Sequence, residues 1–125
     1  MILADTSIWI DFFRSGNPVL RRLLDNNQVV MHSCLVAELA LGSLHNRPST
    51  LAKLDSMPHV RAVDLRDVRQ MIEARKLYAK GIGLTDTQLL ASCLTNPGTL
   101  LWTKDHRLDS VAASLGIKAD LPLQG

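Results

Sequence analysis

Long apolar runs are absent from this sequence, as are the residue patterns of secreted and zinc-binding proteins. No stretch approaches the roughly 20 consecutive apolar residues that a membrane helix requires. The N-terminal residues lack the basic start and small-residue cleavage site of a secretory signal. Cys34 and Cys93 lie far apart within apolar helical patterns, and the four histidines form no i, i+4 pair. We therefore expect a cytoplasmic protein with two buried thiols, and neither a disulfide framework nor a zinc motif.

Glycine-rich phosphate loops are also missing. Neither G-x-x-x-x-G-K-[ST] nor G-x-G-x-x-G occurs, which argues against the common nucleotide-binding folds. No repeat, low-complexity tract or linker interrupts the 125 residues, and an apolar fraction of 46% is enough for a real core. We predict that residues 1–125 form one compact domain.

Short apolar strands alternate with helical patterns along the chain, which predicts a parallel sheet with helices on both faces. The strands are expected at residues 1–4, 28–31, 60–63, 99–102 and 117–118. The helices are expected from Thr6 or Ser7 to about Arg14, from Asn17-Pro18 to Asn26, from Ser33, between Pro48 and Pro58, from Asp64 to about Lys80, from Thr85, and from Asp105 to Gly116.

Two helix starts carry further expectations. The helix from Asp64 is predicted to be the longest of the chain. Thr85-x-x-Gln88 has the form of a capping box, and Leu84 and Leu89 occupy the positions of a hydrophobic staple around it.

Two aspartates, Asp5 and Asp105, each follow an apolar strand and precede a helix. In an open parallel sheet both would lie at the carboxyl ends of strands, where ligands bind. The alternative is that each is only a helix N-cap, which is the commonest role of Asp at such a position.

Glu38 and Asp86 strengthen the case for a site, because each lies within the apolar stripe of its helix. Carboxylates are almost never buried without a partner, and neither stripe contains a basic residue. Four converging carboxylates would repel one another, and a hard divalent cation such as Mg²⁺ removes that repulsion. Setting these four aside leaves 8 acidic residues against 14 basic ones, an excess that would attract a polyanion.

Four segments together resemble the PIN-domain family, and most closely its VapC-type toxins from bacterial toxin–antitoxin pairs. The segments are Ile-Leu-Ala-Asp5-Thr-Ser, Ala-Glu38-Leu-Ala-Leu-Gly, Gly-Leu-Thr-Asp86-Thr-Gln-Leu-Leu-Ala-Ser and Leu-Trp-Thr-Lys-Asp105, and they arrive in the family's order. The resemblance implies a three-layer α/β/α sandwich with a central parallel sheet in the order 3-2-1-4-5. It also implies a Mg²⁺- or Mn²⁺-dependent endoribonuclease that forms a homodimer and is inhibited by a small antitoxin.

The resemblance carries the family's acidic quartet onto Asp5, Glu38, Asp86 and Asp105. We expect Asp5, Asp86 and Asp105 to ligate the metal, partly through waters. Glu38 would ligate a second metal or orient the attacking water. Accessory positions are Ser7, Thr103 and, less securely, Asp109, and the candidates for holding RNA phosphates are Arg14, Lys104 and Arg107.

Other functions remain open at this stage. A phosphoacceptor domain would need an adjacent acidic pair after the first strand, and here Asp5 stands alone. A DxD-type phosphatase would need an aspartate at position 7, where this chain has Ser7. A non-catalytic domain that acts through protein–protein contacts is the third alternative. The target RNA cannot be inferred from the sequence.

Overall fold

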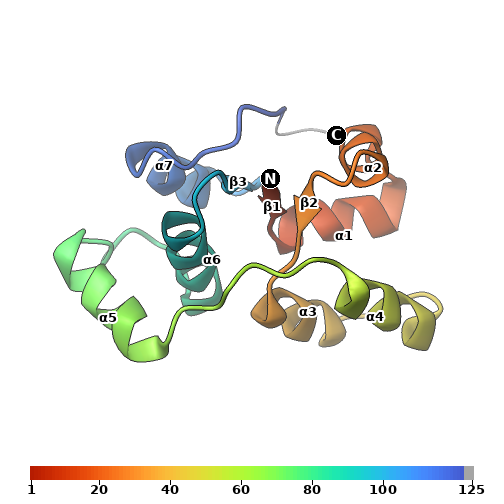
Figure 1. Ribbon diagram of the computed structural model, residues 1–125, viewed down its shortest axis with the longest axis horizontal. Coiled ribbons are helices and arrows are strands. Elements are labelled where there is room, and N and C mark those ends of the chain that lie inside the picture. Colours follow the sequence, from red (N-terminus) through yellow and green to blue (C-terminus); the bar gives the residue numbers. More distant parts are fainter. Residues whose placement is uncertain (123–125) are drawn as a thin grey trace.

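The computed structural model describes residues 1–122, and it places a parallel sheet of three strands at the centre of the molecule (Figure 1). The strand order is β2-β1-β3, with β1 at Ile2–Ala4, β2 at Val29–Val30 and β3 at Leu100–Trp102. The helices of the described residues are α1 (Thr6–Ser15), α2 (Pro18–Asp25), α3 (Ser33–Ala40), α4 (Arg47–Ser56), α5 (Leu65–Ala74), α6 (Leu84–Thr95) and α7 (His106–Ser114).

The parallel α/β architecture confirms the predicted fold class. In Figure 1, α2 and α7 lie towards the top of the view, and α3, α4 and α5 lie towards the bottom. Strands covered by helices are expected to be apolar throughout. Accordingly, Leu3, Ala4 and Leu101 have no exposed surface, and Trp102 is 1% exposed.

The predicted five-strand order is only partly represented. The central three strands lie as expected, but each outer position is a single bridge, Met31 with His59 and Leu101 with Lys118. The full order 3-2-1-4-5 therefore stays a prediction.

The predicted third strand, residues 60–63, does not form. Pro58 has no N–H to donate, although its carbonyl accepts a bond from Met31. The carbonyl of Arg61 accepts bonds from the side chains of Ser92 and Asn96 on α6, at 2.9 and 3.4 Å. Val60 still donates its N–H to the Met31 carbonyl at 2.8 Å, but at Arg61 the segment bonds to α6 and the sheet is not extended further.

The helix predicted from Asp64 to Lys80 ends early, at Ala74, and α6 is longer. Asp64 caps it as expected, by accepting a bond from the backbone N–H of Arg66. At the other end, Lys76 adopts a positive φ of 54°, and Leu77 donates its N–H to the Ile72 carbonyl. This is a Schellman termination with lysine in the position that glycine usually takes.

Three predicted helix starts are wrong by one or two residues. Asp5, and not Thr6 or Ser7, caps α1. His32, and not Ser33, caps α3 by accepting a bond from the Cys34 N–H at Nδ1. At α6 the cap is Gly83, so the capping box does not form. Leu84 is the first helical residue and is 54% exposed, so the expected staple is absent too.

The core joins the sheet to α1, α3, α6 and α7, and it fixes the carboxyl ends of the two neighbouring strands. Ala4 pairs with Trp102, so Asp5 and Thr103 leave β1 and β3 side by side. Cys93 is buried and Cys34 half-buried, and both are free thiols. Within residues 1–122, none of the helices has the length and apolar character needed to cross a bilayer.

Candidate active site

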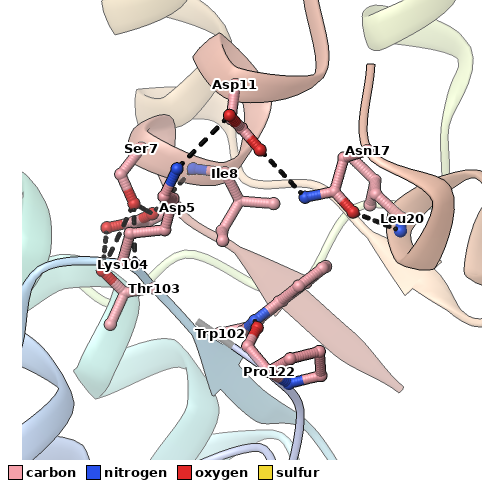
Figure 2. A network of polar contacts seen from close by, with 10 residues as sticks. All are labelled: Asp5, Ser7, Ile8, Asp11, Asn17, Leu20, Trp102, Thr103, Lys104 and Pro122. Carbon is pink, nitrogen blue, oxygen red and sulfur yellow. Dashed lines mark hydrogen bonds and ion pairs between the residues drawn. The ribbon is translucent and has the colours of Figure 1, made fainter. Parts of the chain in front are cut away.

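The carboxylate of Asp5 lies in a set of hydrogen bonds at the end of the central strand (Figure 2). Its Oδ1 accepts from the hydroxyl of Ser7 at 2.5 Å and from the backbone N–H of Ile8 at 3.3 Å. Its Oδ2 accepts from the hydroxyl of Thr103 at 2.5 Å. Both oxygens are therefore held, and the side chain is oriented from β1, α1 and the loop after β3 at once.

The two hydroxyls that donate to Asp5 are themselves oriented by the backbone after β3. The N–H of Lys104 donates to Ser7 Oγ at 2.9 Å, and the N–H of Asp105 donates to Thr103 Oγ1 at 3.0 Å. Because each hydroxyl oxygen accepts one bond, its proton is directed at the carboxylate. Thr103 thus connects Asp5 to the backbone of Asp105, and Ser7 connects Asp5 to the backbone of Lys104.

Asp5 is 3% exposed, and burial raises its pKa above the ordinary value. The hydrogen bonds from Ser7, Thr103 and Ile8 oppose that rise by stabilising the charged form. Without these donors, the ionised form of a carboxylate buried at this position would be strongly unfavourable in free energy.

Asp86 shows that the four acids lie near one another. Burial raises the pKa of Asp86 to about 6, and the negative charge of Asp5 is the next largest cause. Asp105 and Glu38 raise it further, while a backbone hydrogen bond from Gly83 lowers it. A carboxyl group whose pKa is raised by three other carboxylates lies near all three. The structure therefore brings together the four acids that the sequence singles out.

Glu38 lies in the middle of α3, with its Oε2 buried and without a hydrogen-bond partner among the described residues. An unpaired buried carboxylate oxygen costs free energy, on the order of 1–3 kcal/mol or more for a charged group. Such an atom in a native fold suggests a partner that the protein chain does not supply, such as a cation or a water.

Asp105 is exposed and begins α7. Its Oδ1 accepts from the backbone N–H groups of Arg107 and Leu108, at 2.9 and 3.2 Å. The other carboxylate oxygen, Oδ2, accepts no hydrogen bond within residues 1–122. Asp105 is therefore both the N-cap of α7 and a member of the acidic group, so the two sequence-based readings of this residue are compatible.

The donor set suits a hard cation, although it is not closed around one. Within residues 1–122, no three Asp, Glu, His or Cys side chains are grouped closely enough to hold a metal ion as they stand. Mg²⁺ binds through one or two carboxylates and keeps several waters, so it does not require a tight protein cage. All four side chains offer only oxygen, and the unpaired Glu38 oxygen is a free ligand for such an ion.

The other predicted residues lie in different settings. Asp109 forms an ion pair with Lys118 at 3.0 Å, and it is not among the charges that shift Asp86. Lys104 forms an ion pair with Asp11 at 3.3 Å. Arg107 packs over Gly81, where an added Cβ would lie 2.8 Å from the arginine Cδ. Asp109 and Lys104 are therefore each paired with an opposite charge, and Arg107 is packed against the backbone at Gly81.

A cleft of about 660 Å³ opens beside Glu38, and sequence reasoning missed it. Its walls come from α1, α3, the loop after α3 and α4, and Arg14 lines it. The only signal in the sequence was the spacing of Thr6, Ile10 and Phe13, which places them on one face of α1.

Known proteins are similar to this chain over most of its length. The family model of the PIN domain matches residues 2–114. The chain is 35% identical over 117 residues to "Ribonuclease VapC32" of Mycobacterium tuberculosis, which covers 94% of each protein. It is 25% identical over 130 residues to "VapC ribonuclease Mb1587" of Mycobacterium bovis and to "Ribonuclease VapC11" of Mycobacterium tuberculosis, covering 95% of this chain and 97% of each of them.

Proposed function

The chain belongs to the PIN-domain family, in its VapC-type branch, and from this premise we propose that it is a metal-dependent endoribonuclease acting as the toxin of a toxin–antitoxin pair. The observation that carries the proposal is the proximity of three carboxylates to Asp86, whose pKa is raised to about 6 by burial first and then by the charges of Asp5, Asp105 and Glu38. The names of the similar proteins support RNA as the substrate.

The cofactor of this proposal is Mg²⁺ or Mn²⁺, with Asp5, Asp86 and Asp105 as the residues that would hold it. When bound, such an ion neutralises phosphodiester charge and acidifies a bound water. The hydroxyls of Ser7 and Thr103 keep the Asp5 carboxylate in one orientation. Glu38 has an unpaired oxygen, so it can accept a proton from the attacking water or bind a second ion.

Cleavage by the purified protein tests the activity and the role of Glu38 together. We expect the wild type to cut single-stranded RNA with Mg²⁺ and to stop in excess chelator. Glu38→Gln keeps the shape of the side chain and should lose activity by at least about 100-fold, the scale of general acid–base catalysis. Asp109→Asn is the matched control and should retain activity. Equal activity of wild type and Glu38→Gln would contradict the assignment.

The proposal includes two protein partners and a place of action. A small antitoxin could insert a basic side chain into the acidic pocket, where it would compete with the cation. A second copy of the chain is the other expected partner, and the exposed apolar residues Leu65 and Leu84 support it, at 57% and 54% exposed. A monomer seen by light scattering at micromolar concentration would contradict the dimer. With RNA as its substrate, we propose that the enzyme acts in the cytoplasm.

A further inference from the structure

One wall of the cleft beside Glu38 is formed by residues of α1. On α1, Thr6, Ile10, Phe13 and Arg14 line it, and Thr6 directly follows the acid Asp5. From Thr6 to Arg14 the helix rises by about 12 Å at 1.5 Å per residue. The cleft therefore follows α1 from the residue after Asp5 to Arg14, and Glu38 is the member of the acidic group that lines it.

Arg14 has no ion-pair partner within residues 1–122, and the imidazole-bearing residue His45 lines the same cleft. Hydroxyl-bearing residues add polar edges, among them Ser43 and Thr50. The Thr50 hydroxyl donates to the carbonyl of His45 at 2.8 Å, which ties the loop after α3 to α4. Apart from Glu38, the charged and titratable side chains of this lining are basic, which complements an anion.

Phe13 provides an apolar surface inside the cleft, and it is 40% exposed. Its ring packs against Trp9 and Phe12, with centroids 5.7 and 5.8 Å away. Because the two neighbouring rings already restrict the Phe13 ring, a flat molecule that stacks on it costs the side chain little conformational entropy. Nucleobases stack on such exposed aromatic rings in proteins that bind single strands.

We infer that this cleft is the subsite for the nucleotide next to the scissile bond, with its base against Phe13 and its phosphate at Arg14. The inference rests on the proposed ribonuclease activity and deepens it by stating where the strand leaves the acidic group. Glu38 is itself part of the cleft lining, so a strand cut beside Glu38 can continue along the cleft.

A second groove provides the contrast that favours a nucleotide over a protein segment. It has a volume of about 580 Å³ and lies between α5 and α6, where its apolar wall is Leu65, Val68, Ile72 and Leu84. No hydroxyl-bearing or aromatic residue lines it. Arg66 and Arg69 also line the second groove, so the cleft beside Glu38 differs from it in having an aromatic ring and hydroxyls, which an aliphatic groove suited to a protein surface lacks.

Three variants test the subsite. Phe13→Leu keeps an apolar side chain and removes the ring, and it should raise KM for single-stranded RNA roughly five-fold or more with kcat unchanged. Arg14→Gln should lower the slope of log K against log salt by about 0.7, the amount for one phosphate contact on a single strand. This binding is measured in an Asp86→Asn background to avoid cleavage. Arg69→Gln, an exposed arginine in the second groove, is the matched control and should change neither quantity.

A titration with adenosine 5′-monophosphate, followed by amide NMR shifts, tests the cleft without any cleavage. Shifts confined to α1 and the loop 42–45, and lost in Phe13→Leu, would support the subsite. Shifts elsewhere, or Arg14→Gln behaving like Arg69→Gln, would overturn it. So would an amphipathic peptide that occupies the cleft while the nucleotide does not. The nucleotide titration tests the cleft alone and does not depend on catalysis. A wild-type protein that cleaves no RNA would therefore contradict the proposed ribonuclease activity, whatever the titration shows.

Discussion

Asp86 differs from the other aspartates of the pocket because it is neither a strand-end residue nor an N-cap. It lies in the first turn of α6, and its backbone partner is Gly83. Its raised pKa means that the folded protein favours the protonated form, so this group contributes stability below the ordinary pKa of about 4. The contribution is lost as the pH rises through about 6, when the folded state must ionise.

Asp86→Asn should therefore stabilise the metal-free protein above pH 6, by on the order of 1 kcal/mol after allowance for solvent screening. Below pH 4 the gain should vanish. With Mg²⁺ the wild type should gain about RT ln(1 + [L]/Kd), and the variant much less, while cleavage is lost. Thermal melts of both proteins, in chelator and in Mg²⁺, measure these differences. Equal stabilisation of both proteins by Mg²⁺ would mean that Asp86 is not a ligand.

The hydroxyl of Thr103 is the second residue whose contribution can be isolated. Thr103→Val has nearly the same shape but removes the donor to Asp5 Oδ2, and Thr103 has no exposed surface. We expect a loss of about 1.5–3 kcal/mol in the free energy of unfolding, the range for a hydrogen bond to a charged group. Denaturant unfolding measures it. Thr103→Ser retains the hydroxyl and should recover most of the loss, which a purely steric effect of the site would not allow.

At the scale of elements, the structure shows which signals a sequence can carry. The end of α7 was predictable because Gly116 marks it, with φ at 74°. The end of α5 was not predictable, because Lys76 adopts the left-handed conformation that usually requires glycine at a helix C-terminus. The start of α3 was misplaced because histidine is an uncommon cap, whereas Ser33 is a common one.

His32 also joins two helices that carry acids of the pocket. Its Nδ1 accepts from the Cys34 N–H at the start of α3, so Nε2 carries the proton and donates to Ser92 of α6, at 3.1 Å. Burial lowers the pKa of His32, and the charge of His59 lowers it further. The imidazole is 2% exposed and works as a cap only when neutral.

The expected consequence is a loss of stability in acid. The unfolded chain binds a proton at His32 with a pKa near 6.5, and the folded state resists it, so stability falls as the pH drops below that value. His32→Asn retains a cap without titrating, and its stability should fall less between pH 7 and pH 5. Urea unfolding at both pH values measures the difference. Parallel curves for the two proteins would show that His32 does not cause the dependence.

At the scale of the whole molecule, the positions of the four acids were predictable, whereas the shape around them was not. Asp5, Glu38, Asp86 and Asp105 stand out because each breaks a local pattern or ends a strand. The cleft depends on how α1, α3 and α4 pack, and that packing leaves no periodic signal in the chain. The ion pair between Lys104 and Asp11 also depends on tertiary packing, so the sequence did not predict that Lys104 is paired.

The charge distribution predicts how the whole protein meets RNA. Outside the acidic pocket the chain has 14 basic and 8 acidic residues. RNA binding should therefore weaken steeply with salt, with a log–log slope of about −0.7 for each phosphate contact on a single strand. Binding should also be poor in chelator, because bare carboxylates repel the strand. Fluorescence anisotropy across a salt titration, with and without Mg²⁺, measures both effects, and a flat salt response would contradict a basic approach surface.

Two acids of the pocket also stabilise the fold, because Asp5 is the N-cap of α1 and Asp105 is the N-cap of α7. Under the proposed function, a cell that escapes the toxin by mutation would lose the activity at any of the four acids, but the surviving proteins should differ. Substitutions at Asp5 remove a helix cap and a buried hydrogen-bonded anion, so those chains should be scarce because they are degraded. Substitutions at Glu38 leave every helix start intact, so they should yield abundant, folded and silent protein. Under the proposed function such a protein keeps the other three acids, so it should still bind an antitoxin and thereby release active copies made in the same cell.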